Sequence, residues 1–193
     1  MKKKLLEAGN IYGNRIPKHY FMNTGFGQTD AGSGIDPWET GAYDLALLDA
    51  GIENFNVIQY TSVLPPESEE VPFKQVKPLI HHGAVLETIM ANINGHQGDR
   101  LTAGVGRIHV RRIKSGTVIG GFAAEYEGHA SLKHAKMILH QSLAGIFQRR
   151  YSPKVYEMFG EKFTIRSERV TKKWGTCIAV MGFVSYIYPS IEA

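Results

Sequence analysis

The sequence predicts an α+β fold, a four-layer αββα sandwich that forms a single domain over residues 1–193. Three observations lead to this prediction: runs rich in β-branched and aromatic residues, turn signals between them, and two segments with helical character. Their order is strand, helix and strands, and then the same again, which suggests a duplicated strand-helix-strand-strand unit. A chain of 193 residues is long enough to bury a sizeable core.

The first quarter of the chain combines a glycine-rich segment with one expected helix. A short strand is expected at "YFMN" (20–23), and "GFGQTDAGSGID" (25–36) indicates a loop. Asp36 is a suitable N-cap, and the proline that follows it suits the first helical position. We expect this helix to run to about Asp49 and to end at Gly51, a favourable residue just past a helix.

The rest of the chain is expected to contain mainly strands and one long helix. A strand in "NFNVIQYTSVL" (54–64) ends at two prolines, and apolar residues at helical spacing predict a helix over 131–150. The turn signals "NGHQGD" and "KSG" separate further strands. These remaining strands are expected at 84–93, 99–110, 116–128, 161–170 and 175–188.

Composition and charge exclude several classes of protein. The formal net charge of +4 comes from scattered basic residues without interleaved aromatic residues, so no nucleic-acid partner is predicted. No run of about 18 apolar residues occurs, so no membrane span is expected, and the basic start lacks the apolar core of a secretory signal. Cys177 is the single cysteine and is expected to be an inert buried thiol, in agreement with a cytoplasmic location. The eight histidines lack metal-site spacing, so no metal is expected.

Two acidic residues in "GGFAAEYEG" form the first candidate site. Strand alternation places Glu125 and Glu127 on one face, about 7 Å apart at about 3.3 Å per residue. Burial of either carboxyl would raise its pKa and make it a proton donor near neutrality. A solvent-exposed face without chemistry is an equally good interpretation of the pattern.

Asp44 is the second candidate. At helical spacing it shares a face with Leu47 and Leu48, and a carboxylate on an apolar face needs a partner. That partner is either a structural arginine or a cationic ligand, and the pattern alone favours the structural arginine.

Taken in order, these segments resemble the pyruvoyl-dependent arginine decarboxylases. The resemblance rests on "LLDAGIENFNVIQYTSVLPPESE", on "GGFAAEYEG" about sixty residues later, and on the long helix that follows. It implies self-cleavage between Thr61 and Ser62 into a β chain (1–61) and an α chain (62–193), with Ser62 converted into a covalent pyruvoyl cofactor. It also implies conversion of L-arginine to agmatine and CO₂ through a Schiff base on that group.

The resemblance also implies roles for individual residues. Glu125 is the expected proton donor, Asp44 the expected contact of the substrate guanidinium with Leu47 as its apolar companion, and Asn56 a residue that supports processing or substrate binding. A carboxylate suits a guanidinium because it accepts two parallel N–H bonds. The family further implies a homo-oligomer of αβ protomers, either a trimer or a hexamer built as a dimer of trimers.

Spacing suggests where these residues meet. Asn56 and Ser62 share a strand face but would lie about 20 Å apart on a straight strand. Our hypothesis is therefore that Asn56 and Asp44 act on Ser62 of a neighbouring subunit.

Three alternatives stay open on the sequence. The same chemistry could act on another amino acid, such as histidine. The chain could instead be a self-cleaving hydrolase that keeps Thr61 or Ser62 as an N-terminal nucleophile. The third alternative is a basic binding module without catalysis, in which Ser62 only ends a strand.

Overall fold

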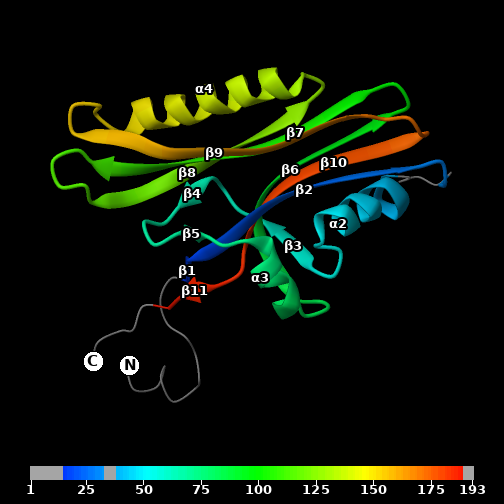
Figure 1. Cartoon of the computed structure of the whole chain (residues 1–193), viewed down its shortest axis with the longest axis horizontal. Coiled ribbons are helices and arrows are strands. Elements are labelled where there is room, and N and C mark those ends of the chain that lie inside the picture. The colour runs from blue at the N-terminus through cyan, green and yellow to red at the C-terminus, as the bar shows by residue number, and fades with distance from the viewer. Residues whose placement is uncertain (1–14, 33–37, 189–193) are drawn as a thin grey trace, which may run out of the picture.

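Two β-sheets pack face to face, and a helix covers the outer face of each (Figure 1). The computed structural model describes residues 15–32 and 38–188. The five-stranded sheet has the order β3 (Asn56–Gln59), β6 (Val85–His96), β10 (Trp174–Phe183), β2 (His19–Thr29) and β5 (Glu69–Glu70). The four-stranded sheet has the order β4 (Val63–Leu64), β8 (Val118–Gly128), β7 (Arg100–Arg112) and β9 (Tyr156–Arg169).

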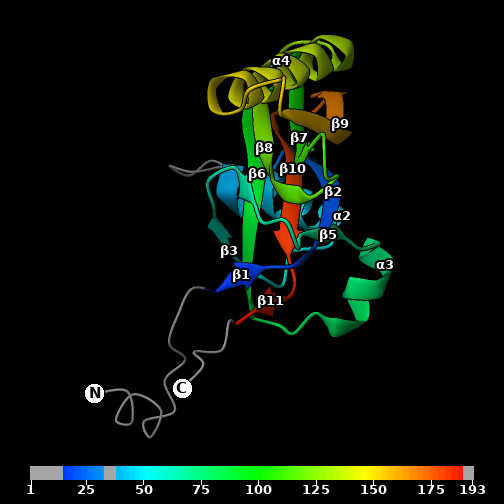
Figure 2. The same ribbon diagram turned by 90° about the vertical axis from the view of Figure 1, so that its left-hand side faces the viewer.

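Helix α2 (Asp44–Ala50) packs on the five-stranded sheet, and helix α4 (Leu132–Arg150) packs on the four-stranded sheet, as Figure 2 shows from the side. These four layers confirm the predicted α+β sandwich. The chain ends of the described region meet in a small ribbon of β1 (Ile16–Pro17) and β11 (Tyr186–Ile187). The short helix α3 (Phe73–Val76) and the 3₁₀ turn Lys77–Leu79 complete the elements.

Side chains along β10 alternate between the two faces of the five-stranded sheet, so this one strand contributes to two hydrophobic clusters. Cys177, Ala179 and Met181 point into the core between the sheets, whereas Ile178 and Val180 pack in the cluster beneath α2. All five are fully buried. A strand buried on both faces is apolar throughout, which is why this segment is a nearly continuous hydrophobic run.

The glycine-rich segment was predicted wrongly as a loop from residue 25 onward, because β2 continues to Thr29. The two glycines are needed for packing. A Cβ on Gly25 would overlap the carbonyl oxygen of Ala46, and a Cβ on Gly27 would overlap that of Ala42. The helix backbone therefore lies directly on the strand, which only glycine allows.

The predicted buried face of the first helix was also wrong. Ala42, Ala46 and Ala50 are fully buried against the sheet, whereas Leu48 is 56% exposed. Small side chains face the glycines of β2 because the two backbones approach so closely. The helix ends as expected, with Gly51 in the left-handed conformation at φ 73°. Its expected N-cap, Asp36, lies outside the described residues, and a π-helical segment (Trp38–Tyr43) leads into α2.

The strand expected over 54–64 is broken in the structure. Residues 56–59 form β3 and pair in parallel with β6, whereas residues 63–64 form β4 and pair with β8 of the other sheet. The intervening residues 60–62 cross from one sheet to the other. The straight-strand geometry assumed for Asn56 and Ser62 is therefore wrong, because sequence pattern does not report a change of sheet.

The other expected elements are confirmed with small shifts at their ends. Ser131 caps α4, since its Oγ accepts a hydrogen bond from the His134 N–H at 3.4 Å. The "NGHQGD" turn connects β6 to β7, which belong to different sheets. The last expected strand divides into β10 and the short β11.

Candidate active site

The crossing between the sheets carries the expected scissile bond. Thr61 is exposed and Ser62 is half-buried. The carbonyl oxygen of Ser62 accepts a hydrogen bond from the backbone N–H of Ala123 at 3.0 Å, and the pairing of Val63 with Phe122 continues this contact along β8. Leu64 is buried in the core between the sheets. The backbone on the C-terminal side of Ser62 is therefore anchored to β8.

Glu125 lies on the same strand and contacts the serine. The hydroxyl of Ser62 donates a hydrogen bond to Oε2 of Glu125 over 3.3 Å. Although the residue is exposed at the edge of the sheet, partial burial of its carboxyl raises the pKa of Glu125 above its ordinary value. The negative charge of Glu127 raises this pKa further, whereas the hydrogen bond from Ser62 lowers it. The result is a carboxyl that keeps its proton to a higher pH than an ordinary glutamate.

Glu127 connects the two sheets. Its Oε1 accepts a hydrogen bond from the backbone N–H of Asn92 at 2.8 Å. Asn92 belongs to β6 beyond the four residues that pair with β3, so its N–H is available to a side chain. The predicted alternation is confirmed, because Phe122, Ala124 and Tyr126 pack toward α4 on the opposite face.

The remaining predicted site residues lie elsewhere in the same chain. Asp44 is exposed on α2, and Leu47 is half-buried against the five-stranded sheet. Asn56 is exposed at the start of β3, where its side-chain amide donates to the carbonyl of Gly83 at 2.9 Å. Among the described residues, no hydrogen bond connects Asp44 or Asn56 to Ser62 or Glu125. Within the described part of one chain, the acid that hydrogen-bonds to Ser62 is thus Glu125.

A group of residues around Tyr60, two positions before Ser62, was missed by the sequence analysis. Arg15 pairs with the buried Glu87, donates to the hydroxyl of Tyr60 at 3.3 Å, and lies over the ring of Tyr186. The signal was present, since Glu87 is a lone acid in the apolar run "AVLETIM". A charge in a buried strand needs a partner, but the pattern does not say which residue provides it.

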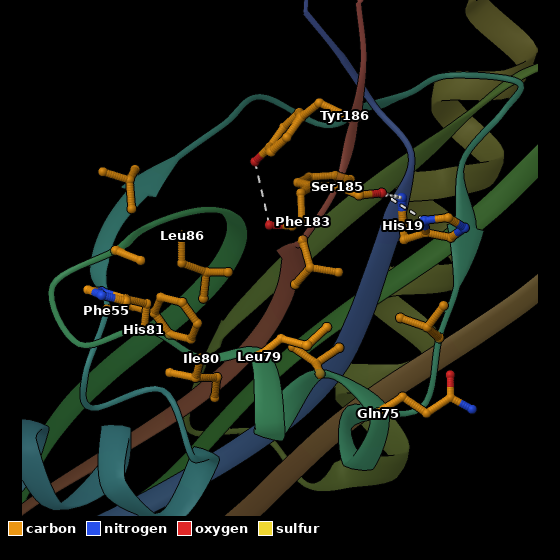
Figure 3. Close-up of a pocket in the computed structure, with 15 residues that line it drawn as sticks. His19, Phe55, Gln75, Leu79, Ile80, His81, Leu86, Phe183, Ser185 and Tyr186 are labelled. Carbon is orange, nitrogen blue, oxygen red and sulfur yellow. Dashed lines mark hydrogen bonds between the residues drawn. The ribbon is translucent and has the colours of Figure 1, made fainter.

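An apolar cavity of about 510 Å³ lies between α3, β10 and the loop before β6 (Figure 3). Its lining includes His19 and Ser185, whose Nδ1 and Oγ lie 2.7 Å apart. Ser62, Glu125, Asp44 and Asn56 do not line it. The cavity is therefore separate from the serine and its acid.

Three further observations concern other classes of site. Cys177 is fully buried, as predicted, and this burial raises the pKa of its thiol to about 11. Within residues 15–32 and 38–188, no group of three or more histidine, cysteine or acidic side chains could hold a metal ion. None of the helices described is both long and apolar enough to cross a membrane.

The fold and the site thus define a layered α+β protein with a serine–carboxyl pair where the chain crosses between its sheets. Residues 19–187 match the family model described as pyruvoyl-dependent arginine decarboxylase. The chain belongs to the pyruvoyl-dependent arginine decarboxylase family.

Individual relatives agree with this assignment. The chain is similar to the pyruvoyl-dependent arginine decarboxylase AaxB of Chlamydia trachomatis serovar L2, with 38% identity over 190 residues, covering 91% of this chain and 94% of the relative. It is 37% identical over 188 residues to the protein of that name from Chlamydia muridarum, with the same coverage. A pyruvoyl-dependent arginine decarboxylase of Methanocaldococcus jannaschii is 34% identical over 112 residues, covering 58% of this chain and 63% of the relative.

Proposed function

We propose that this protein decarboxylates L-arginine to agmatine and CO₂, using a pyruvoyl group made from Ser62. The observation that carries the proposal is the contact between the Ser62 hydroxyl and the Glu125 carboxyl in a chain of this family. The pyruvoyl carbonyl supplies the electron sink for decarboxylation once the substrate amine is attached to it. The protein residues must then bind arginine, exclude water and deliver a proton to the α-carbon.

The pyruvoyl group would arise by self-cleavage. The Oγ of Ser62 attacks the carbonyl carbon of Thr61, and the peptide bond becomes an ester. Elimination across the Cα–Cβ bond of Ser62 then releases the carboxylate of Thr61, and hydrolysis of the resulting enamine releases ammonia and leaves the ketone. The Ser62 carbonyl anchored to Ala123 supports this role, because it holds one side of the scissile bond. The expected products are chains 1–61 and 62–193.

The residues around Ser62 fit such a group. The carboxyl of Glu125 is already within hydrogen-bonding distance of the Ser62 side chain, and burial raises its pKa. A protonated carboxyl at this place can donate to the carbon that loses CO₂. Glu125 is therefore proposed as the proton donor, with its proton replaced from solvent because the residue is exposed.

Substrate recognition would involve a second subunit. Asp44 and Asn56 are exposed, and β3 and β4 are both edge strands beside the crossing. Exposed apolar side chains accompany them, with Ile58 at 49% and Val63 at 56% exposure. Open strand edges and apolar side chains favour burial by another copy of the chain.

We therefore propose that Asp44, Leu47 and Asn56 of one protomer face Ser62 of another. In this arrangement Asp44 binds the guanidinium of arginine and Leu47 packs against its aliphatic chain. A ring-like assembly of three protomers satisfies this head-to-tail contact, and a hexamer would be a dimer of such trimers. The cytoplasm is the proposed location, consistent with the free thiol of Cys177.

Intact-mass analysis of the purified protein tests the proposed function. The expected result is two chains, with the larger one blocked at its N-terminus by a ketone that borohydride reduces. A free amino terminus at residue 62 would support the hydrolase alternative instead. Release of labelled CO₂ from arginine, with histidine as the control substrate, then tests the proposed specificity. A single uncleaved chain without CO₂ release would refute the proposal.

A further inference from the structure

Glu87 is a buried carboxylate that the proposed decarboxylation does not use. Its side chain is 7% exposed, and its neighbours Leu86 and Thr88 are buried as well. A carboxylate in such surroundings is strongly disfavoured unless a cation pairs with it. The side chains around Glu87 therefore show what kind of cation this site accepts.

The cation present is the guanidinium of Arg15, and three different groups contact it. Glu87 forms an ion pair with it, and the centre of the Tyr186 ring lies 4.5 Å from its central carbon. The hydroxyl of Tyr60 accepts a hydrogen bond from Nη2 at 3.3 Å. A carboxylate, an aromatic face and a phenol oxygen together match the fork, the planar face and the edge of a guanidinium.

Arg15 does not saturate this site. Oε1 of Glu87 contacts Arg15, whereas Oε2 is buried and has no hydrogen-bond partner among the described residues. A guanidinium that is not attached to the protein chain can orient itself to form two parallel N–H bonds to a carboxylate. The side chain of Arg15 is 42% exposed, so solvent reaches the group that occupies the site. A free guanidinium compound that displaces the Arg15 side chain would therefore find a carboxylate oxygen still without a hydrogen-bond partner.

The site lies next to the expected scissile bond. Tyr60 immediately precedes Thr61 and Ser62, and its ring packs on Phe183 with the centroids 5.7 Å apart. Its backbone N–H donates to the carbonyl of Thr88 at 2.6 Å, one residue beyond Glu87. Whatever guanidinium occupies the site therefore contacts the residue from which the crossing starts.

We propose that Glu87, Tyr60 and Tyr186 form a second guanidinium-binding site, distinct from the proposed Asp44 contact, in which Arg15 competes with free guanidinium compounds. The ligand class is an alkyl guanidinium, which includes arginine and agmatine. The site rests on contacts within one chain, so it does not depend on the proposed function.

Binding to uncleaved chains tests this proposal. The background protein carries Ser62→Ala, which prevents the expected cleavage, and Asp44→Ala, which removes the other proposed guanidinium contact. Arg15→Gln is then added to remove the internal competitor, and Glu87→Gln to remove the carboxylate. The probe is agmatine in calorimetric titration. The matched control is 1,4-diaminobutane, which has the same charge and chain length but no guanidinium.

Arg15→Gln should increase the affinity for agmatine by about tenfold or more. Agmatine can bind only those molecules in which Arg15 has left the site, and the apparent affinity is reduced by that fraction. Adding Glu87→Gln should abolish this gain, and diaminobutane should show none. Equal agmatine affinity with and without Glu87→Gln would overturn the proposal, as would an equal gain for diaminobutane. Arg15→Gln leaves the buried Glu87 without a cation and can impair folding. Arg15→Lys is therefore a second variant, which keeps a cation beside Glu87 but removes the guanidinium. It should also bind agmatine more tightly than the background, and an unchanged affinity there would again contradict the site.

Discussion

The hydroxyl of Ser62 and the carboxyl of Glu125 lie 3.3 Å apart although the two residues are 63 positions apart in the chain. Their meeting depends on the crossing at residues 60–62, which carries the chain from the five-stranded sheet to the edge of β8. A serine at a sheet crossing and an acid on the adjoining strand are thereby held by the backbone pairing of both sheets.

Replacing the acid should uncouple cleavage from turnover. Glu125→Gln keeps an oxygen that can accept the hydrogen bond from Ser62, so cleavage into two chains should continue. The variant lacks a transferable proton, and kcat for arginine should fall by roughly 10²–10⁴-fold. Mass spectrometry and CO₂ release measure the two effects. An unchanged kcat would show that Glu125 is not the proton donor.

The pH profile should depend on Glu127. Because the pKa of Glu125 is raised by burial and by the charge of Glu127, activity should fall as the pH rises through that pKa and the proton is lost. Glu127→Gln retains an acceptor for the Asn92 N–H but removes the charge. The falling limb should then move to lower pH, because the charge that raises the pKa of Glu125 has been removed. Glu161→Gln, on the far strand β9, is the control and should leave the limb in place.

Mixed oligomers should reveal a shared site. A chain with Asp44→Ala and a chain with Ser62→Ala should each be inactive alone. When they are refolded together in equal amounts, about one quarter of the interfaces should combine an intact Ser62 with an intact Asp44. CO₂ release should return in proportion to the number of these intact interfaces. If the mixture stays as inactive as its components, both residues act within one subunit and the proposed arrangement is wrong.

Gly25→Ala should be severely destabilising. The added Cβ overlaps the backbone carbonyl of Ala46, and neither strand nor helix can move without disturbing the core. We expect a loss of about 3 kcal/mol or more in the free energy of unfolding. Gly83→Ala is the matched control, since its Cβ would meet nothing within 4 Å and only its φ of 80° is unfavourable. That variant should lose about 1 kcal/mol. Equal losses in urea denaturation would contradict the close packing of α2 on β2.

Acid should weaken the contact of β5 with the four-stranded sheet. Burial alone would raise the pKa of Glu70, but hydrogen bonds from Lys162 and Arg107 outweigh it and hold the pKa below its ordinary value of 4.5. Because the folded-state pKa is depressed, this stabilisation is present above pH 4.5 and is lost as the pH falls through the folded-state pKa.

Glu70→Gln should therefore cost about 1–3 kcal/mol at pH 7, and the difference from the parent protein should shrink in acid. Denaturant titrations at pH 7 and pH 3 measure it. The neighbouring Glu69 is the control, because its side chain is 70% exposed and Glu69→Gln should change stability by less than about 0.5 kcal/mol. A Glu70 effect that does not depend on pH would point to packing instead of charge.

Features set by neighbouring residues were predictable from the sequence. Ser131 caps a helix and Gly51 ends one because each acts on backbone groups within a few positions of itself. The common face of Glu125 and Glu127 follows from the two-residue period of a strand. The motif around Thr61 and Ser62, together with "GGFAAEYEG" and the long helix after it, indicated the family. All of these depend on short-range geometry.

Tertiary structure decided the features that depend on distant partners. Gly25 and Gly27 belong to a strand because they pair with β10, and they must be glycine because a helix backbone lies against them. No local signal reports either neighbour. The break at residues 60–62 arises because each half of the predicted strand finds its pairing in a different sheet. Arg15 and Glu87 form an ion pair although 72 positions separate them. A buried carboxylate requires a cation, and the tertiary structure determines which one lies close enough to pair with it. The chemistry available to this protein thus follows from its residue types and their local spacing, whereas pairing between remote segments places Glu125 next to Ser62.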